Sequence, residues 1–505
     1  MDGVEQLKQD VRDGRVSAER LVELLVSLQR ELQAARQSLA DARRRIEELE
    51  KRLGGAETVK FAEPFSLRAE ELRQEARGKK KRKRSRPLRR GRVTTAEKIQ
   101  QAQRTEKVFP AGVSHSDCQL SHTRPVWRLE AGHAVLVAYE IYRGPKNQYG
   151  KIPGVLGRSE FGVEIVIAIA YQVHLVGLSF DKVCLLMGFF QNLRLRKSQV
   201  DALLNQLSRH WAGEFERLCT LLANSAVVHA DETSWSINSV WAFLSEKVRV
   251  LFFGVHKDAA TLQAILDPAT FAGIVVSDDA AVYANFTQAQ KCWAHLLRKA
   301  IQLTLLEPAH AEYRRFADRL LEIYRSACRV QRDGRLSDAG RARKVAEFDD
   351  EILELCGPTY FAELPPSDGA ANDFRLLCNE LMRLMLAQEL FTFVTAAAVT
   401  TPQGETQPVA GTNNEAERTL RSSATARKTG RTNKTLGGAR RQTILVSVLE
   451  SLRCFLPKYT LTTVIAEIQR WCDTGQSCFA ELLTSLKLAP PARSLLDRLL
   501  PVPSG

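Results

Sequence analysis

Residues 25–53 carry the most regular hydrophobic pattern of the chain. Apolar side chains recur there in steps of three and four over four heptads, and the positions between them are Arg, Glu, Gln and Asp. The repeating positions are Leu25, Leu28, Leu32, Ala35, Leu39, Ala42, Ile46, Leu49 and Leu53. A 3.5-residue period keeps such side chains on one face of a supercoiled helix. Residues 1–56 are therefore predicted to form a coiled coil that joins two copies. A lone helix packed on the body is the alternative.

Residues 57–110 are polar and contain breakers, which predicts a flexible linker. Segment 79–92 holds ten Lys or Arg in fourteen residues and no acid. Like charges repel, so this run is expected to be disordered alone and to bind DNA phosphates, with a solubilising tail as the alternative. The candidate phosphate-binding side chains are Lys79, Lys80, Lys81, Arg82, Lys83 and Arg84.

Residues 111–222 are predicted to be a helical, DNA-binding region. The clearest helices fall within 161–222, with Ser179 and Ser198 as N-caps. A short helix, a turn and a second helix opened by Arg196-Lys197-Ser198 resemble a helix-turn-helix. Helices that only pack on the next domain remain an equal alternative.

From residue 223 the pattern changes to short apolar runs typical of strands. One run ends at Asp231, and two more form a hairpin joined near Glu246-Lys247. A helix at 259–266 is followed by a strand that ends at Asp278. This order predicts an α/β catalytic domain over 223–455 with a ribonuclease-H-like mixed sheet. A helical tail is expected over 456–505.

Carboxylates at the ends of adjacent strands repel each other, and a divalent cation relieves that repulsion. Oxygen ligands select Mg²⁺ or Mn²⁺, and two such ions can drive phosphodiester chemistry. A third acid is then needed, and the helix expected within 411–428 offers Glu415 and Glu417. Basic residues follow in that helix and are candidates for DNA contact: Arg418, Arg421, Arg427 and Lys428.

Composition narrows the class of protein. The chain has 505 residues, 44% apolar and 26% charged, which excludes collagen, a mainly disordered chain and a disulfide miniprotein. The net charge is +14, of which segment 79–92 supplies +10. Such an excess indicates a polyanionic partner. No apolar run approaches the length of a membrane span and no signal peptide is visible, so we expect a cytoplasmic, nucleoid-associated protein with reduced cysteines.

Some individual residues invite a second interpretation. His115, Cys118 and His122 have a spacing that suggests zinc, but the usual paired cysteine is missing. Trp235 is a candidate for stacking on a splayed base and equally for the core. His295 could lie near the metal site or cap the start of a helix, and we favour a structural role. We expect Tyr283 and Trp293 to be packing residues.

Four blocks in order resemble the DDE-type transposases of the insertion sequence 66 family. They are HADET at 229–233, SD followed five residues later by Tyr283, CWAH at 292–295 with Arg298-Lys299, and NNEAER at 413–418 with Arg427-Lys428. The resemblance covers roughly 160–455, and an N-terminal coiled coil is also typical of the family.

The resemblance implies Asp231, Asp278 and Glu417 as the three catalytic, metal-binding acids. Glu415 and Asp279 are then not catalytic, and Asp279 stands where a Gly is usual. It also implies a helical insertion, here about 307–405, with helices expected at 311–328, 337–356 and 371–398. The chain departs from the family in lacking a paired-cysteine zinc element, and in the Thr429-Gly430-Arg431 sequence that follows Lys428.

The leading interpretation is a DNA transposase that cleaves element ends and transfers 3′-OH ends into target DNA. Double-stranded DNA is the expected partner, with a homodimer or higher oligomer on DNA and other proteins of the same element as further partners. The alternative is a catalytically inactive, transposase-derived dimeric DNA-binding protein or repressor. A purely structural coiled-coil protein would leave the strand-end acids unexplained.

Overall fold

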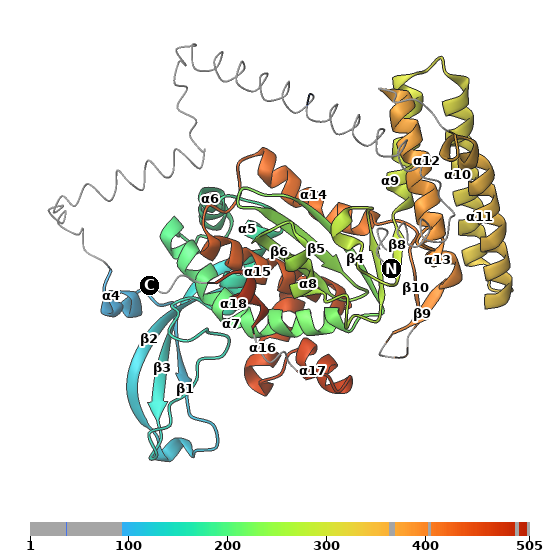
Figure 1. The fold of residues 1–505 in the computed structure, drawn as a ribbon. Helices are drawn as coiled ribbons and strands as arrows, with labels where there is room; N and C mark the ends of the chain where they lie inside the picture. The colour runs from blue at the N-terminus through green and yellow to red at the C-terminus, as the bar shows by residue number, and fades with distance from the viewer. Residues whose placement is uncertain are drawn as a thin grey trace, which may run out of the picture. The chain divides into compact units, whose positions relative to one another are not determined.

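The computed structural model describes residues 93–362, 369–401, 404, 406–489 and 494–501, together with Gln37. The predicted coiled coil and the basic run, including Lys79–Arg84, lie outside the described residues. The described residues from 93 onward belong to one compact unit. Sheets and helices together make the described part a mixed α/β fold (Figure 1).

The first described elements form a small sheet. Helix α4 (Thr95–Gln100) precedes β1 (Arg104–Val108), the short η1 (His115–Asp117), β2 (Gln119–Glu130) and β3 (His133–Arg143). The strand order is β1-β3-β2, with β1 parallel and β2 antiparallel to β3. Our expectation of helices from 111 onward is wrong for 119–143. The reason is that β-branched and aromatic side chains of both strands form a separate core of their own, which includes Val126, Val137, Tyr139 and Ile141.

A run of helices follows from residue 163, close to the expected start at 161. They are α5 (Val163–His174), α6 (Phe180–Phe190) and α7 (Lys197–Ala223). Ser179 caps α6 by accepting a hydrogen bond from the Lys182 amide. The expected cap at Ser198 is wrong, because Arg196 occupies the N-cap of α7 and its amide donates to Oε1 of Gln199 at 2.9 Å.

Helix α7 is a core helix over most of its length. Its buried side chains include Leu204, Leu207, Trp211 and Phe215, and it packs on α5 and α15. These contacts match the packing alternative for this region. Contact of its first turn with DNA stays a prediction.

The central sheet has five strands in the order β6-β5-β4-β7-β8. Their bounds are β4 (Val227–Ser234), β5 (Ser239–Leu244), β6 (Arg249–Val255), β7 (Ile274–Ser277) and β8 (Ala289–Lys291). Strand β5 is antiparallel to β4 and β6, whereas β7 runs parallel to β4 and β8. The predicted hairpin around Glu246-Lys247 is confirmed as β5–β6, and the predicted helix at 259–266 is α8 (Ala259–Ile265). The short η2 (Ala281–Tyr283) follows β7.

Both faces of this sheet are buried, since alternate residues enter different cores. In β5, Trp241 and Phe243 join the core of α5 and α7, whereas Val240 and Ala242 face α14 (Asn414–Lys428). On β7, Ile274 and Val276 pack with α9 (Trp293–Leu306) and the helices that follow. A strand buried on two faces has a continuous apolar sequence rather than an alternating one.

The outer strand β6 is covered by α15 (Leu436–Phe455). Hydroxyls four residues apart on α15 accept from successive unpaired amides of β6: Thr443 from Phe253, Ser447 from Leu251 and Ser451 from Arg249, at 2.9, 2.9 and 3.0 Å. A helix that satisfies the open edge prevents further strand pairing there.

The helical insertion follows the sheet, and α9 to α12 lie side by side in Figure 1. It comprises α10 (Ala311–Arg332), α11 (Asp338–Tyr360), α12 (Ala370–Leu386), α13 (Thr392–Thr395), β9 (Ala398–Thr400) and β10 (Thr406–Pro408). The helices expected at 311–328 and 337–356 are confirmed. The one expected at 371–398 ends at Leu386, and Gln388 then takes a positive φ of 58°, which no helix interior accepts.

The last helices are α16 (Leu461–Thr474), α17 (Cys478–Ser485) and α18 (Leu495–Leu499). Phe479 and Leu496 share one core with α5, α7 and one face of the sheet. That core therefore crosses the boundaries that we expected at 222/223 and 455/456. Among the described helices, none combines the length and apolarity that a membrane span requires.

Candidate functional site

Asp231 and Asp278 meet at the same level of two adjacent parallel strands. The register pairs His229 of β4 with Val276 of β7. Two residues further along each strand are Asp231 and Asp278, so their positions match. The carboxyl ends of parallel strands are where open α/β sheets place their sites. The structure thus brings these two predicted acids together.

The position of Asp231 within its strand differs from our expectation. Strand β4 does not end at Asp231 but continues to Ser234, because it still pairs with β5 after β7 has ended. Asp278 directly follows the last residue of β7, as expected. Its Oδ1 accepts the amide of Ala280 at 3.1 Å, which fixes the turn after the strand.

Asp231 has an unusual electrostatic environment. Burial, followed by the negative charges of Glu232, Asp278 and Glu417, raises the pKa of its carboxyl from 3.8 to about 7. The amide of Glu232, 2.9 Å from Oδ1, opposes the rise. Neither Asp231 nor Asp278 forms an ion pair within the described part of the chain. The site therefore holds concentrated negative charge with no side-chain cation directly on these two carboxylates.

The acid next to Asp231 in sequence has partners of its own. Glu232 is buried; its Oε1 lies 2.6 Å from Nζ of Lys257, and its Oε2 accepts from the hydroxyl of Tyr283 at 2.5 Å. Tyr283 is fully buried, as expected for a packing residue, but it also holds this carboxylate. Sequence reasoning missed both contacts, because they join residues far apart in the chain.

The other two neighbouring acids are also paired. Asp279 forms an ion pair with Arg383 of α12, and Glu415 forms one with Arg249 of β6. Asp278, in contrast, forms no ion pair with another described residue. This difference agrees with the choice of Asp278 over Asp279.

Glu417 lies in the first turn of α14. Its Oε1 is 2.5 Å from the Arg298 guanidinium and 3.6 Å from Nδ1 of His295. Its charge reaches Asp231, but the three predicted acids do not bring their oxygens within 4.8 Å of one another. Among the described residues, the group of His, Cys, Asp or Glu that meets this distance is Cys292, His295 and Glu417. Repulsion between carboxylates and attraction to Arg298 both favour this placement of Glu417.

Asn413 is a residue whose role the sequence did not reveal. We considered it as a cap of the helix, and it is the N-cap of α14, but its side chain makes no capping bond. Instead its Nδ2 donates to the carbonyl of Ala230 at 2.7 Å, and its Oδ1 accepts from Nδ1 of His229 at 3.3 Å. Asn413 is fully buried. It fastens the start of α14, and so Glu417, to the strand that carries Asp231.

Two aromatic candidates prove to be buried. Trp235 is 6% exposed, packs on Phe253 and donates to Oδ1 of Asn433 at 3.3 Å, so the core alternative holds. Trp293 is fully buried and donates to the carbonyl of Leu390 at 2.7 Å, as expected for packing.

The suggested zinc spacing near residue 118 does not assemble. The ring of His115 stacks on Phe109 at 4.0 Å, and Sγ of Cys118 donates to the carbonyl of Ser114 at 3.3 Å. In the part of the chain that the structure describes, these residues form no metal-binding group.

The predicted basic residues of α14 are exposed on one helix beside the acids. They are Arg418, Arg421, Arg427 and Lys428. Arg427 donates to the carbonyl of Ser234 at 2.9 Å, which ties the far end of α14 to the end of β4. The helix therefore presents cations next to the strand that carries Asp231.

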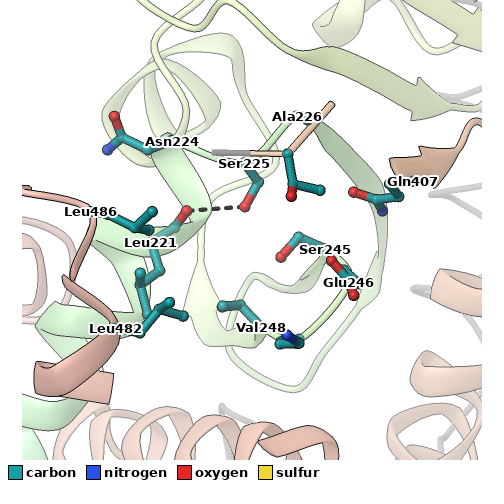
Figure 2. A pocket seen from close by; sticks show the side chains of 12 residues that line it. Leu221, Asn224, Ser225, Ala226, Ser245, Glu246, Val248, Gln407, Leu482 and Leu486 are labelled. Atoms are coloured by element: carbon teal, nitrogen blue, oxygen red, sulfur yellow. Dashed lines mark hydrogen bonds between the residues drawn. The ribbon is translucent and has the colours of Figure 1, made fainter. Parts of the chain in front are cut away.

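A pocket at the opposite end of β4 does not belong to this site. Figure 2 shows its lining at Ala226, just before β4, and at the β5–β6 turn around Ser245. Ser225 donates there to the carbonyl of Leu221 at 2.9 Å. None of the three predicted acids lines it.

Comparison with known proteins identifies a family for the chain. No curated protein matches the chain. A family model described as "Transposase IS66 family" matches residues 158–441, which is more than half of the 505 residues. The matched range contains the five-stranded sheet, its helical insertion and all three predicted acids. The chain belongs to the IS66 family of transposases.

Proposed function

We propose that the chain is a DDE-type DNA transposase that cleaves element ends and joins their 3′-OH groups to target DNA. Membership in the family supports a DNA transposase in general. The strand order β6-β5-β4-β7-β8, with β5 alone antiparallel to β4, supports a ribonuclease-H-like core. The observation that carries the proposal is the pairing of Asp231 and Asp278 at one level of adjacent strands.

The residues present fit divalent cations. The carboxylates of Asp231 and Asp278 lie close together, and neither has an ion-pair partner among the described residues. Burial and neighbouring negative charges raise the pKa of Asp231 to about 7. All candidate donor atoms are oxygens, which suits Mg²⁺ or Mn²⁺. When bound, such ions supply Lewis-acid stabilisation and activation of the attacking oxygen at the phosphodiester.

Each side chain then has a distinct role. Asp231 and Asp278 would hold a cation with oxygen ligands from the sheet, and Glu417 would offer a third oxygen from α14 if its carboxylate separated from Arg298. Arg298 is about half exposed, so its side chain has room to move away. Lys257 and Tyr283 hold Glu232 in a separate network, so its charge is compensated beside the site.

DNA is proposed to lie along α14. Arg418, Arg421 and Lys428 are exposed there and form no ion pair with other described residues. Cations on one helix beside the acids would contact phosphates and place the strand near Asp231 and Asp278. The segment 79–92 is proposed to add affinity without sequence choice, and residues 1–56 to link two copies on DNA.

A strand-transfer assay with labelled element ends and Mg²⁺ tests the proposal. Asp231→Asn and Asp278→Asn should lose cleavage on the order of 10³-fold, which corresponds to roughly 4 kcal/mol of transition-state stabilisation. Both should retain DNA binding. The matched control is Asp279→Asn, whose carboxylate is paired with Arg383 and should matter far less. Full activity of Asp278→Asn would contradict the assignment. Absence of product from wild type with any end would favour a DNA-binding protein without catalysis.

A further inference from the structure

The start of α9 carries a second group of metal-ligand atoms. One ligand atom from each of Cys292, His295 and Glu417 lies within 4.8 Å of the others. Cys292 precedes the first residue of α9 and His295 lies in its first turn. Glu417 approaches from the first turn of α14. Three different donor types therefore meet between two helices.

The hydrogen bonds around these atoms leave the His295 nitrogen without a partner and hold the Cys292 sulfur near α14. Nδ1 of His295 is buried and makes no hydrogen bond, although it lies 3.6 Å from Oε1 of Glu417. A buried nitrogen without a partner costs free energy, and a metal ion in its lone-pair direction would remove that cost. Sγ of Cys292 accepts the amide of Asn413 at 3.1 Å, which fixes the sulfur on the side of α14.

The donor set differs in chemistry from that of Asp231 and Asp278. Sulfur and imidazole nitrogen select zinc and similar borderline ions, whereas Mg²⁺ prefers oxygen. Bond lengths of about 2.0–2.3 Å to zinc place tetrahedral ligands roughly 3.3–3.8 Å apart. The His295–Glu417 distance already falls in that range, and the remaining pairs need to close by about 1 Å at most.

We propose that Cys292, His295 and Glu417 form a Zn²⁺ site, with water as the fourth ligand, and that its occupation withholds Glu417 from Asp231 and Asp278. On binding, the thiol of Cys292 loses its proton to solvent and the sulfur bonds to the ion. Arg298 then separates from Glu417, because the bound zinc neutralises the charge of the carboxylate. The withholding of Glu417 rests on its proposed role in cleavage, whereas the Zn²⁺ site itself does not.

Cobalt titration of the full chain without DNA tests the site itself. Co²⁺ replaces zinc in such sites, and a thiolate ligand gives an intense near-ultraviolet charge-transfer band. Wild type should show this band at about one equivalent and lose it when Zn²⁺ is added. Cys292→Ser should not show it. Cys118→Ser, which removes a more exposed thiol at the end of η1, is the matched control and should keep it.

Each result decides the proposal. A wild-type protein without the band, or a folded Cys292→Ser protein with it, would overturn the site. If Cys292→Ser fails to fold, which circular dichroism reports, His295→Gln replaces it. That variant should bind Co²⁺ at least about 100-fold more weakly, because loss of an outer partner alone costs ~10–100-fold. Wild-type affinity in His295→Gln would equally overturn the site.

Cleavage with Mg²⁺ under added Zn²⁺ tests the withdrawal of Glu417. Zinc should slow wild-type cleavage at the concentration that abolishes the cobalt band. The half-inhibitory zinc concentration, with each protein's rate normalised to its own rate without zinc, should be at least about tenfold higher in Cys292→Ser than in wild type. If zinc binds but cleavage is unaffected, Glu417 is not shared. If no variant or condition gives cleavage, the proposed function fails while the cobalt result still stands.

Discussion

Two regions of this transposase lie near Glu417 and differ in every donor atom. At the sheet, Asp231 and Asp278 offer only oxygen, and they are placed by the β4–β7 register. At the start of α9, Cys292 and His295 offer sulfur and nitrogen, and they are placed by one helical turn. In the structure Glu417 stands with the second pair. The comparison teaches that the donors beside it, oxygen at the sheet or sulfur and nitrogen at α9, would decide whether Glu417 joins a hard or a borderline metal ion under the proposals above.

Replacing the shared residue should have the largest effect. Glu417→Gln removes a charged oxygen from both regions, so cleavage should fall on the order of 10³-fold and cobalt affinity should fall as well. Strand cleavage and cobalt titration on the same preparation provide the measurement. Glu415→Gln, two residues away and paired with Arg249, is the control. Loss of only one of the two properties would show that Glu417 serves a single region.

Asn413→Ala should have the next largest effect, since it releases α14 from β4. The change leaves the carbonyl of Ala230 and the ring of His229 without their buried partner, which costs about 1–3 kcal/mol of unfolding free energy. Cleavage should fall roughly 10–100-fold through displacement of Glu417. Chemical denaturation and the dependence of cleavage on Mg²⁺ concentration check both effects. The exposed Asn414→Ala is the control. A loss of stability with unchanged Mg²⁺ dependence would make Asn413 purely structural.

The sheet region alone should respond to pH when no metal is added. The folded-state pKa of Asp231 is about 7, above its ordinary value of 3.8, so ionisation is costlier in the folded protein. Its contribution to stability is present below pH 3.8 and is lost as pH rises through about 7. At pH 8 Asp231→Asn should be more stable than wild type by up to roughly 4 kcal/mol, and near pH 4 the two should agree. Urea unfolding across this range provides the measurement.

The control for that pH dependence is Asp279→Asn, whose stability difference from wild type should not follow the same profile. Saturating Mg²⁺ should shrink the advantage of Asp231→Asn, because the ion stabilises the ionised carboxylate in wild type. An Asp231→Asn protein that is less stable than wild type at pH 8 without metal would contradict the electrostatic account of the sheet edge.

The two regions also differ in how far the sequence predicted them. Apolar runs ending near Asp231 and Asp278 located two acids, since strand pattern and chemistry coincide there. The sequence could not predict that β4 extends beyond Asp231, because that extension depends on pairing with β5 rather than on the residues of β4. The grouping of Cys292 with Glu417 depends on how α9 and α14 pack across 125 residues of sequence, and no local pattern encodes that.

The same limit explains the other corrections. Residues 119–143 carry β-branched and aromatic side chains that are typical of strands. They were nevertheless included in the predicted helical region, because the helical pattern of the residues that follow is stronger. The role of Asn413 was invisible because its partners, His229 and Ala230, are more than 180 residues away. A helix with a strong amphipathic period, such as α10, was found because its signal is local.

An exchange of metal preference tests the central claim, that Asp231 holds the cation used in cleavage. Asp231→Cys replaces a hard oxygen with a soft sulfur at one ligand, and sulfur accepts Mn²⁺ far better than Mg²⁺. Cleavage by this variant should be abolished in Mg²⁺ and restored at least about tenfold by Mn²⁺, whereas Asp279→Cys should show the wild-type ratio of the two activities. Equal loss of cleavage in both metals, or a ratio unchanged from wild type, would contradict direct contact between Asp231 and the ion.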